Sequence, residues 1–540
     1  MEDIQGLQKE GKLKEAEAIL QNIANAYPDN IEALFSLGTN YAMMGCDGLA
    51  TVLLRFCLAL PSGEHDDNIW NNLGTCWRKL YLNDRAEHAF RRAWSISQRA
   101  DIASNLSTLD VNEGEPEKGL PWARAAIELD PCHRHANWNM SLMLLELERW
   151  EQGFRQYAWG LATGDRQRKV YAAKPFVPWW NGSSLHGKRI VVTGEQGLGD
   201  ELMFASQINE LCDQAKQVIF DCHPRLEHLF RYSFRKWRAK NRLHIHPTRK
   251  RTDGKETWPK NYPRIDCKRS LADTPMYLRR QPEDFPRQVY LEAEPPLVNQ
   301  FKRWIKLIRP GEPVRPVGIA WMGGRRQTRK DLRAIPLREL YPLCKAAKEL
   351  DFTLIDVNYV DQSWEVKEAL SEGLRIWQFP EIFQHERWEC YRLNGQDYPD
   401  KFAAKEAAKI TRASNENITH IPGPGFDFMD TAAFVQAIAE LGGIIICVNS
   451  TMVHLCGALG APCWSLTPKR PAWRYGLKST RMQWYADHIF QFRQNDANTW
   501  DDVLRQVIGA LFELAYNPNT KKFTEELHGR TDLASVRDAQ

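Results

Sequence analysis

The sequence "KRIVVTGEQGLGDELMF", residues 188–204, runs from a short apolar segment through a glycine-rich turn into a stretch that fits a helix. The segment Ile190–Thr193 is rich in β-branched residues, which is typical of a buried strand. A second such segment, "AKQVIFDC" at 215–222, follows the helical stretch. Strands that alternate with helices predict a parallel sheet with crossover helices.

The same alternation resumes after a break at residues 308–316, "IRPGEPVRP". Three later β-branched segments have helical stretches between them: 317–324, 351–357 and 442–450. The pattern therefore predicts two α/β domains followed by a helix and a polar tail. Their expected ranges are 188–307, 316–498, 499–517 and 518–540.

The first 164 residues have a repeating pattern of helical segments. Leu37-Gly38 with Tyr41 matches Leu73-Gly74 with Trp77, at an interval close to that of tetratricopeptide repeats. Glycine after leucine lets two helices approach closely, and prolines follow the helical segments at positions 28, 61 and 131. We expect about five helix pairs stacked as an α solenoid, with an irregular helical bundle as the alternative. Residues 165–187 are rich in proline, glycine and serine and are predicted to be a linker.

The composition is that of an ordinary globular protein, with 43% hydrophobic and 26% charged residues and a net charge of +4. The 12 cysteines form no CxxC pair, which favours reduced thiols and a cytoplasmic location. The polar N-terminus predicts no secretory signal, and no apolar stretch is long enough to span a membrane.

The glycine-rich turn does not match the known phosphate-binding motifs. Gly194, Gly197 and Gly199 are not in the order of G-x-G-x-x-G, and Asp200-Glu201 replaces the Lys-Ser/Thr of a P-loop. Asp200 has two interpretations at this point. It is a favoured helix-capping residue, and it is also an acid at a turn whose backbone favours anions, which the capping role alone does not require.

Four blocks in order resemble bacterial and phage tetratricopeptide-repeat glycosyltransferases, whose catalytic part is similar to the heptosyltransferase family (glycosyltransferase family 9). The first is "WWNGSSLHGKRIVVTGEQGLGDELMFA" and the second is "GIAWMGGRRQTRKDLRAIPLRELYPL". The third begins "DFMDTAAFVQAIAELGGIIICVNSTMVHLCGALG" and continues to "RPAWRYG", and the fourth is "MQWYADHIFQFRQ". The resemblance implies a GT-B fold, in which two Rossmann-like domains face each other and the C-terminal one binds the donor.

The resemblance also implies roles for the turn. Asp200 would be the general base that takes the proton of the acceptor hydroxyl, with Glu201 as the second candidate. Gly197 and Gly199 would let the backbone approach the acceptor without a Cβ clash. The family needs no metal or other cofactor, and the nucleotide sugar is a cosubstrate.

The donor is expected at the start of the helix after "GGIIICV". Asn449 or Ser450 would cap this helix, leaving the N–H groups of Thr451 and Met452 open to a diphosphate. Asn449 replaces an acid that in the family contacts the donor sugar. His454, one turn further on, is expected either to face the ligand or to be a core residue.

Two cationic loops are predicted to neutralise the departing diphosphate, since arginine forks bind phosphate oxygens well. Some of these side chains are expected to be merely solvated. The candidates are Arg325, Arg326, Lys330, Arg333, Lys469, Arg470 and Arg474.

Residues 225–255 are strongly basic with interleaved aromatic residues, and lie on the expected acceptor side. Arg235, Trp237 and Arg238 are candidates for contact with an acidic acceptor, such as a hydroxylated base in DNA or a phosphorylated glycan. The alternative is a solvated helix with core-facing aromatics. His244 and His246 have no suitably spaced partner for a metal site. Residues 385–420 read as an insertion.

The main hypothesis is a metal-independent enzyme that moves a hexosyl or heptosyl group from a nucleotide sugar to an acceptor hydroxyl. The acceptor is either an acidic polymer or a protein or glycan recruited by the solenoid. The rival hypothesis is a non-catalytic tetratricopeptide scaffold with a degenerate GT-B body, of which Asn449 would be a trace.

Overall fold

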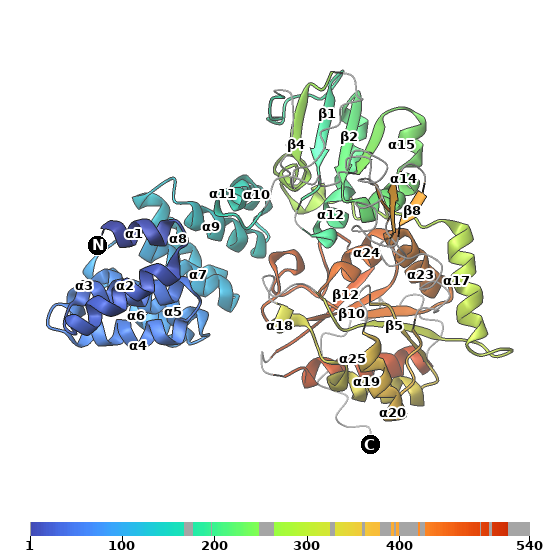
Figure 1. Ribbon diagram of the computed structural model, residues 1–540. Coiled ribbons are helices and arrows are strands. Elements are labelled where there is room, and N and C mark those ends of the chain that lie inside the picture. The colour runs from blue at the N-terminus through green and yellow to red at the C-terminus, as the bar shows by residue number, and fades with distance from the viewer. Residues whose placement is uncertain are drawn as a thin grey trace. The chain divides into compact units, whose positions relative to one another are not determined.

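The computed structural model describes residues 2–166, 177–195, 197–247, 264–323, 330–358, 362–378, 390–393, 396–398, 419–421, 427–485, 488–495 and 499–516. The chain divides into two compact units, Met1–Asp165 (unit 1) and Arg166–Gln540 (unit 2). Unit 1 is a solenoid of helix pairs, and unit 2 contains two parallel sheets covered by helices (Figure 1). This confirms the predicted combination of helical repeats and parallel-sheet α/β structure.

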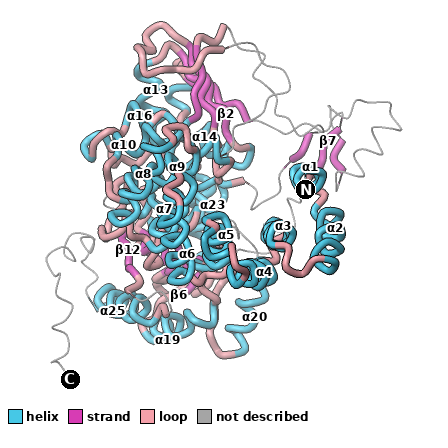
Figure 2. Tube along the Cα trace, turned by 90° about the vertical axis from the view of Figure 1, so that its left-hand side faces the viewer, coloured by secondary structure: helices cyan, strands magenta, loops and turns pink. Residues whose placement is uncertain are grey.

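Unit 1 consists of five successive helix pairs in which each helix packs on the next, seen as stacked cyan coils in Figure 2. Short helices η2 (Tyr157–Trp159) and α11 (Gly160–Thr163) follow the last pair, and η1 (Gly63–His65) lies between the second and third. The paired helices are α1 (Glu2–Lys9) with α2 (Leu13–Ala26), α3 (Ile31–Met43) with α4 (Asp47–Ala59), α5 (Asp67–Lys79) with α6 (Asn83–Ile96), α7 (Ala100–Glu113) with α8 (Pro116–Leu129), and α9 (Arg134–Glu146) with α10 (Trp150–Gln156).

The local signals in the repeats have the predicted effects. Helices α2, α4 and α8 each end two residues before a proline, because proline cannot continue a helix. A Cβ at Gly74 would stand 2.6 Å from the Phe90 ring, so glycine is what allows α5 and α6 to pack this closely. Phe90 and Leu73 are fully buried in the core of these repeats.

The first lobe of unit 2 is built on a four-stranded parallel sheet in the order β3-β2-β1-β4. Its strands are β1 (Arg189–Thr193), β2 (Gln217–Cys222), β3 (Leu243–Pro247) and β4 (Cys267–Ser270). Its helices and short turns are α12 (Leu198–Phe204), η3 (Ala205–Gln207), α13 (Ile208–Gln214), η4 (Pro224–Leu226), α14 (Glu227–Ser233), α15 (Arg235–Ala239), η5 (Leu271–Asp273), α16 (Pro275–Leu278) and η6 (Pro282–Asp284). The described end of the predicted linker belongs to this lobe, since Trp180 N–H donates to Lys268 O at 2.9 Å.

The second lobe of unit 2 is built on a five-stranded parallel sheet in the order β12-β11-β10-β5-β6. Figure 1 shows α23 and α24 on one face of the sheet and α19, α20 and α25 on the other. The strands are β5 (Pro316–Ala320), β6 (Thr353–Asp356), β10 (Ile444–Val448), β11 (Cys463–Thr467) and β12 (Ile489–Arg493). The helices are α18 (Lys330–Arg333), η8 (Leu337–Leu340), α19 (Tyr341–Glu349), α20 (Ser363–Ser371), α23 (Phe428–Glu440), α24 (Thr451–Leu459), η10 (Trp473–Tyr475) and α25 (Asp501–Tyr516).

Helix α17 (Pro295–Leu307) follows the first lobe in sequence and packs on α23 of the second. The predicted insertion at 385–420 contributes strands of a small antiparallel sheet, β8-β7-β9: β7 (Cys390–Leu393), β8 (Gln396–Tyr398) and β9 (Thr419–Ile421). Among the described residues, no helix is both long and apolar enough to cross a lipid bilayer.

Candidate active site

The glycine-rich turn leads from β1 directly into α12, as predicted. Gly197 is the N-cap residue of α12, which places Asp200 at the third helical position. Asp200 Oδ2 accepts a hydrogen bond from Gly197 N–H at 3.4 Å, so this carboxylate helps to cap the helix without being its N-cap residue. The capping interpretation therefore accounts for one carboxylate oxygen and leaves the other for a different partner.

The other oxygen of Asp200 points to the second lobe. Asp200 Oδ1 is ion-paired with Arg474 Nε in η10, and the two side chains are 18% and 16% exposed. Helix α12 packs against α24 (Figure 1). The two helices are closest at Gly199, where a Cβ would lie only 3.0 Å from His454 and 3.2 Å from the Thr451 backbone. Glycine at position 199 thus permits a contact between lobes, which is a different reason from the predicted approach to an acceptor.

Glu201, the second candidate base, faces into the first lobe. It is 5% exposed, and its Oε1 accepts from His223 N–H at 2.6 Å. A Cβ at Gly194 would collide with the Glu201 carboxylate, so the first glycine of the turn makes room for this buried acid. Glu201 therefore stabilises the connection after β2, and it is not brought to the contact between the lobes.

The predicted donor residues begin α24 at the carboxyl end of β10, where ligands bind in open parallel sheets. Ser450 is the N-cap residue, and its Oγ accepts from Met452 N–H at 3.3 Å. The expectation that this N–H is open is therefore wrong, because the capping hydroxyl already uses it. Thr451 starts the helix beside Gly199 of the first lobe.

Asn449 is 1% exposed, and its Oδ1 accepts from Ser465 at 2.6 Å and Thr467 at 3.1 Å. In the described part of the protein, its Nδ2 has no hydrogen-bond partner. Buried amide donors are normally paired. The Asn449 amide at the carboxyl end of β10 is therefore an exception to this rule.

His454 lies in the core instead of facing a ligand. Its Nε2 is 3.3 Å from Tyr475 Oη and its Nδ1 is 3.2 Å from Tyr485 Oη. Burial, followed by the charges of Arg474 and Arg333, lowers the pKa of His454 to about 3. A neutral imidazole has one donor and one acceptor, and the two tyrosines use both. This supports the core interpretation of His454 over the ligand interpretation.

The remaining cationic candidates are divided between the site and its surroundings. Arg333, at the end of α18, is half-buried and lies close enough to His454 to affect its pKa. Lys469 is exposed, and its backbone N–H donates to Gln494 at 3.1 Å. Arg470, on the same loop, is half-buried. Arg325, Arg326 and the side chain of Lys330 lie outside the described residues.

The acceptor-side candidates are engaged within the first lobe. Arg235 forms an ion pair with Glu292 at 2.7 Å. Trp237 donates to Asn209 at 2.9 Å, and Arg238 donates to a backbone carbonyl at 3.2 Å. The aromatic residues Phe230 and Phe234 are buried in the core. These contacts favour the alternative of a solvated helix with core-facing aromatics, although residues 248–255 of the basic stretch lie outside the described residues.

A buried ion-pair cluster lies behind the turn and was not predicted. Arg166 Nη2 contacts both Glu195 and Asp273, and Ser270 Oγ donates to Glu195. The side chains of the three charged residues are at most 3% exposed. Burial raises the pKa of Glu195. The sequence contains one signal for this cluster, because Glu195 is an acid inside a glycine-rich turn. Its partner Arg166 lies near the start of the predicted linker, far from the turn in sequence, so the ion pair could not be inferred.

Unit 1 contains a second candidate surface, made by the first helix of each pair. Asn105 Nδ2 donates to Asn71 Oδ1 at 2.8 Å, and Asn139 Nδ2 donates to Thr108 Oγ1 at 2.8 Å. Asn71 and Asn105 are 34 residues apart, and Asn139 follows at the same interval. This amide spacing is the signal that could have identified the row from sequence.

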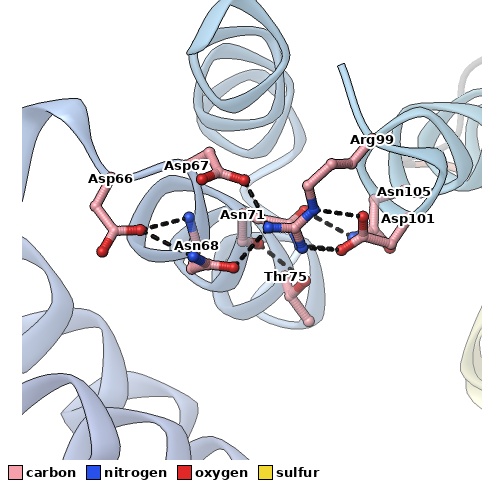
Figure 3. Close-up of polar contacts among 8 residues, drawn as sticks. All are labelled: Asp66, Asp67, Asn68, Asn71, Thr75, Arg99, Asp101 and Asn105. Atoms are coloured by element: carbon pink, nitrogen blue, oxygen red, sulfur yellow. Dashed lines mark hydrogen bonds and ion pairs between the residues drawn. The ribbon is translucent and has the colours of Figure 1, made fainter. Parts of the chain in front are cut away.

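Figure 3 shows the centre of this row, where Arg99 lies between two carboxylates. Arg99 forms ion pairs with Asp67 and Asp101, each at 2.6 Å, and donates to Asn68 at 2.7 Å. A groove of about 210 Å³ in unit 1 is lined by residues of α3 and α5. The lining residues are Thr39, Ala42, Met43, Asn72, Thr75 and Lys79. Among the described residues of both units, no group of three or more His, Cys, Asp or Glu could hold a metal ion.

Comparisons with known proteins give a distant relative and several helical-repeat structures. No protein-family profile matches the chain. Protein FlbA of Caulobacter vibrioides is 23% identical over 510 residues, which cover 91% of this chain and 74% of that protein. The crystal structure of MamA is 19% identical, covers 31% of this chain and 96% of its own, and has a TM-score of 0.27. A thermophilic tetratricopeptide protein of Thermus thermophilus is 16% identical, with 31% and 90% coverage and a TM-score of 0.27.

Proposed function

We propose that unit 2 is a metal-independent glycosyltransferase of the GT-B type. It would move a sugar from a nucleotide-sugar donor, bound at the second lobe, to an acceptor hydroxyl at the first. Asp200 would take the hydroxyl proton as the acceptor oxygen bonds to the anomeric carbon. The bond from that carbon to the diphosphate breaks, and its electron pair leaves with the nucleoside diphosphate.

One observation carries this proposal. A carboxylate of the first lobe, Asp200, meets Arg474 of the second lobe beside the start of α24. Arg333 also lies near this point. Transfer of a sugar from a diphosphate needs a base for the acceptor hydroxyl. It also needs cations or a helix N-terminus to stabilise the departing diphosphate.

The proposal is tested by incubating the full-length protein with a panel of nucleotide sugars and measuring thermal unfolding and hydrolysis of the donor. A true donor at 100 times its dissociation constant adds about 2.7 kcal/mol to the free energy of unfolding. If no nucleotide sugar raises the unfolding temperature or is consumed, the non-catalytic scaffold is the better interpretation.

The role of Asp200 is tested by Asp200→Asn. We expect transfer to fall by about 10²- to 10⁴-fold, which is the usual contribution of a positioned general base. Donor binding should persist, since the carboxylate would act on the acceptor. The neighbouring variant Glu201→Gln should instead lower stability, because Glu201 accepts a buried backbone hydrogen bond. Full transfer by Asp200→Asn would assign the base to another group.

For the acceptor, we propose a protein segment recruited by unit 1. The groove between helices of unit 1 is lined by polar side chains, including Thr39, Asn72 and Thr75, which would face the main chain of an extended peptide. The predicted nucleic-acid acceptor has less support, because Arg235 and Trp237 already have partners in the first lobe. Residues 1–165 form a compact unit, and deleting them should abolish transfer to a protein acceptor while leaving donor hydrolysis intact. Retention of protein transfer would argue against recruitment.

A further inference from the structure

Building on the proposed function, we propose that Arg474 is a diphosphate-sensing residue that releases Asp200 only when a donor is bound. In the free protein, Arg474 holds Asp200 across the contact between the lobes. A bound diphosphate would attract the same guanidinium, and the Asp200 carboxylate would then be open to the acceptor hydroxyl.

The contacts of Asp200 support an exchange of partners. One oxygen accepts from Gly197 N–H and the other is paired with Arg474, so each carries a partner in the free protein. Arg474 is the partner that we expect to move, because its guanidinium is the end of a long side chain in the short helix η10. The Gly197 bond, in contrast, is part of the helix start.

The surroundings of Arg474 supply a destination for it. Arg474 is paired with Asp200 of α12, and Gly199 of the same helix lies against Thr451 at the start of α24. Guanidinium groups bind phosphate oxygens in a bidentate manner, and a diphosphate carries more charge than one carboxylate. The exchange of Asp200 for diphosphate is therefore electrostatically favourable. The Arg474–Asp200 ion pair would also keep Asp200 from deprotonating an acceptor hydroxyl before a donor is bound.

Thermodynamic linkage makes this mechanism testable without an acceptor. If Asp200 competes with the diphosphate for Arg474, removing its charge must tighten diphosphate binding. Binding of UDP, GDP, CDP and ADP to the full-length protein is measured by calorimetry. For the nucleotide that binds, Asp200→Asn should bind about 5-fold tighter, and Arg474→Gln should bind about 10- to 100-fold weaker. The double variant should bind as weakly as Arg474→Gln alone, and Arg474→Lys should lie between.

Two matched controls remove comparable charges elsewhere in unit 2. Asp213→Asn and Lys478→Gln change exposed residues outside the site and should leave nucleotide affinity unchanged. If the wild type binds a nucleotide but Asp200→Asn binds it equally or more weakly, the partner exchange is wrong while the proposed enzyme survives. If the wild type binds none of the nucleotides, both the exchange and the proposed function are overturned.

Discussion

In unit 1 a row of neutral amides, with the Arg99–Asp67 ion pair at its centre, joins successive helix pairs, whereas ion pairs cross between the two lobes of unit 2. Asn105 and Asn139 donate to polar groups of neighbouring helices in unit 1. In unit 2, Asp200 pairs with Arg474, and His228 contacts Asp427 and Glu294. Neutral hydrogen bonds are insensitive to salt and to pH near neutrality, while ion pairs respond to both and to charged ligands. The amide contacts of unit 1 should therefore respond less to salt and to charged ligands than the ion pairs between the lobes of unit 2.

The largest expected effect is the loss of the buried cluster behind the turn. Arg166→Met leaves Glu195 buried without its cation and Asp273 with Arg269 alone at 3.6 Å, which costs about 3–5 kcal/mol of stability. Hydrogen exchange of β1 and β4 measures this loss. It should be smaller at pH 5 than at pH 8, because burial raises the pKa of Glu195 and protonation relieves the unpaired charge.

The control for this prediction is Arg155→Met, which removes an exposed ion pair with Glu151 and should change stability by less than about 0.5 kcal/mol. An Arg166→Met protein as stable as the wild type at pH 8 would show that the cluster is not held by its charges.

The next effect concerns helix packing in unit 1. At Gly74, an added Cβ would lie 2.6 Å from the buried Phe90 ring. Gly74→Ala should therefore lower stability by about 1–2 kcal/mol, since overpacking costs about 1–3 kcal/mol and alanine returns up to about 1 kcal/mol of helix propensity. Gly38→Ala is the matched control, because its Cβ would be 3.3 Å from Leu54. Chemical denaturation should find Gly38→Ala near neutral, and equal losses at both sites would contradict the packing argument.

The packing at Gly74 is one of several local features that could be predicted from the sequence. The helix pairs, the prolines after their ends and the strand–turn–helix at 188–204 are local features, because the residues that cause them are neighbours along the chain. The close approach at Gly74 followed from the Leu-Gly-x-x-aromatic spacing. The start of α12, with an acid beside it, was likewise predictable.

The candidate site was predictable only in part, because it depends on contacts between distant segments. The sequence indicated Asp200 and Arg474 separately, but nothing local shows that they pair. It also indicated His454 without the two tyrosines that occupy its ring nitrogens. Glu201 and Asp200 are adjacent acids, and only the tertiary fold assigns one to the core and the other to the contact between the lobes.

A smaller effect is expected from the amide row. Asn139→Ala removes hydrogen bonds to Ser107 and Thr108 and should lower the stability of unit 1 by about 1 kcal/mol. The loss should be the same at pH 6 and pH 9 and at low and high salt, because both partners are neutral. Urea denaturation at these conditions measures it. A strong salt dependence would remove the distinction between the amide contacts of unit 1 and the ion pairs between the lobes of unit 2.

The smallest effect, and the sharpest test of that distinction, is the pH response of His228. This side chain of α14 lies 3.0 Å from both Asp427, the N-cap residue of α23, and Glu294, the N-cap residue of α17. The hydrogen bond to Asp427, then that to Glu294, raises the pKa of His228 to about 9 from 6.5. A raised pKa means that the folded state binds the proton more tightly than the unfolded state. The resulting stabilisation is complete below pH 6.5 and is lost as the pH rises through 9.

His228→Gln keeps a hydrogen-bonding side chain but cannot carry the charge, so the variant should lack this loss of stability between pH 6.5 and 9. Because the histidine is nearly half exposed, solvent screens the pair and the change should be small. Thermal unfolding of wild type and His228→Gln across this pH range measures the difference, with exposed His186→Gln of the first lobe as the control. Parallel pH profiles for all three proteins would mean that His228 is not charged where the lobes meet.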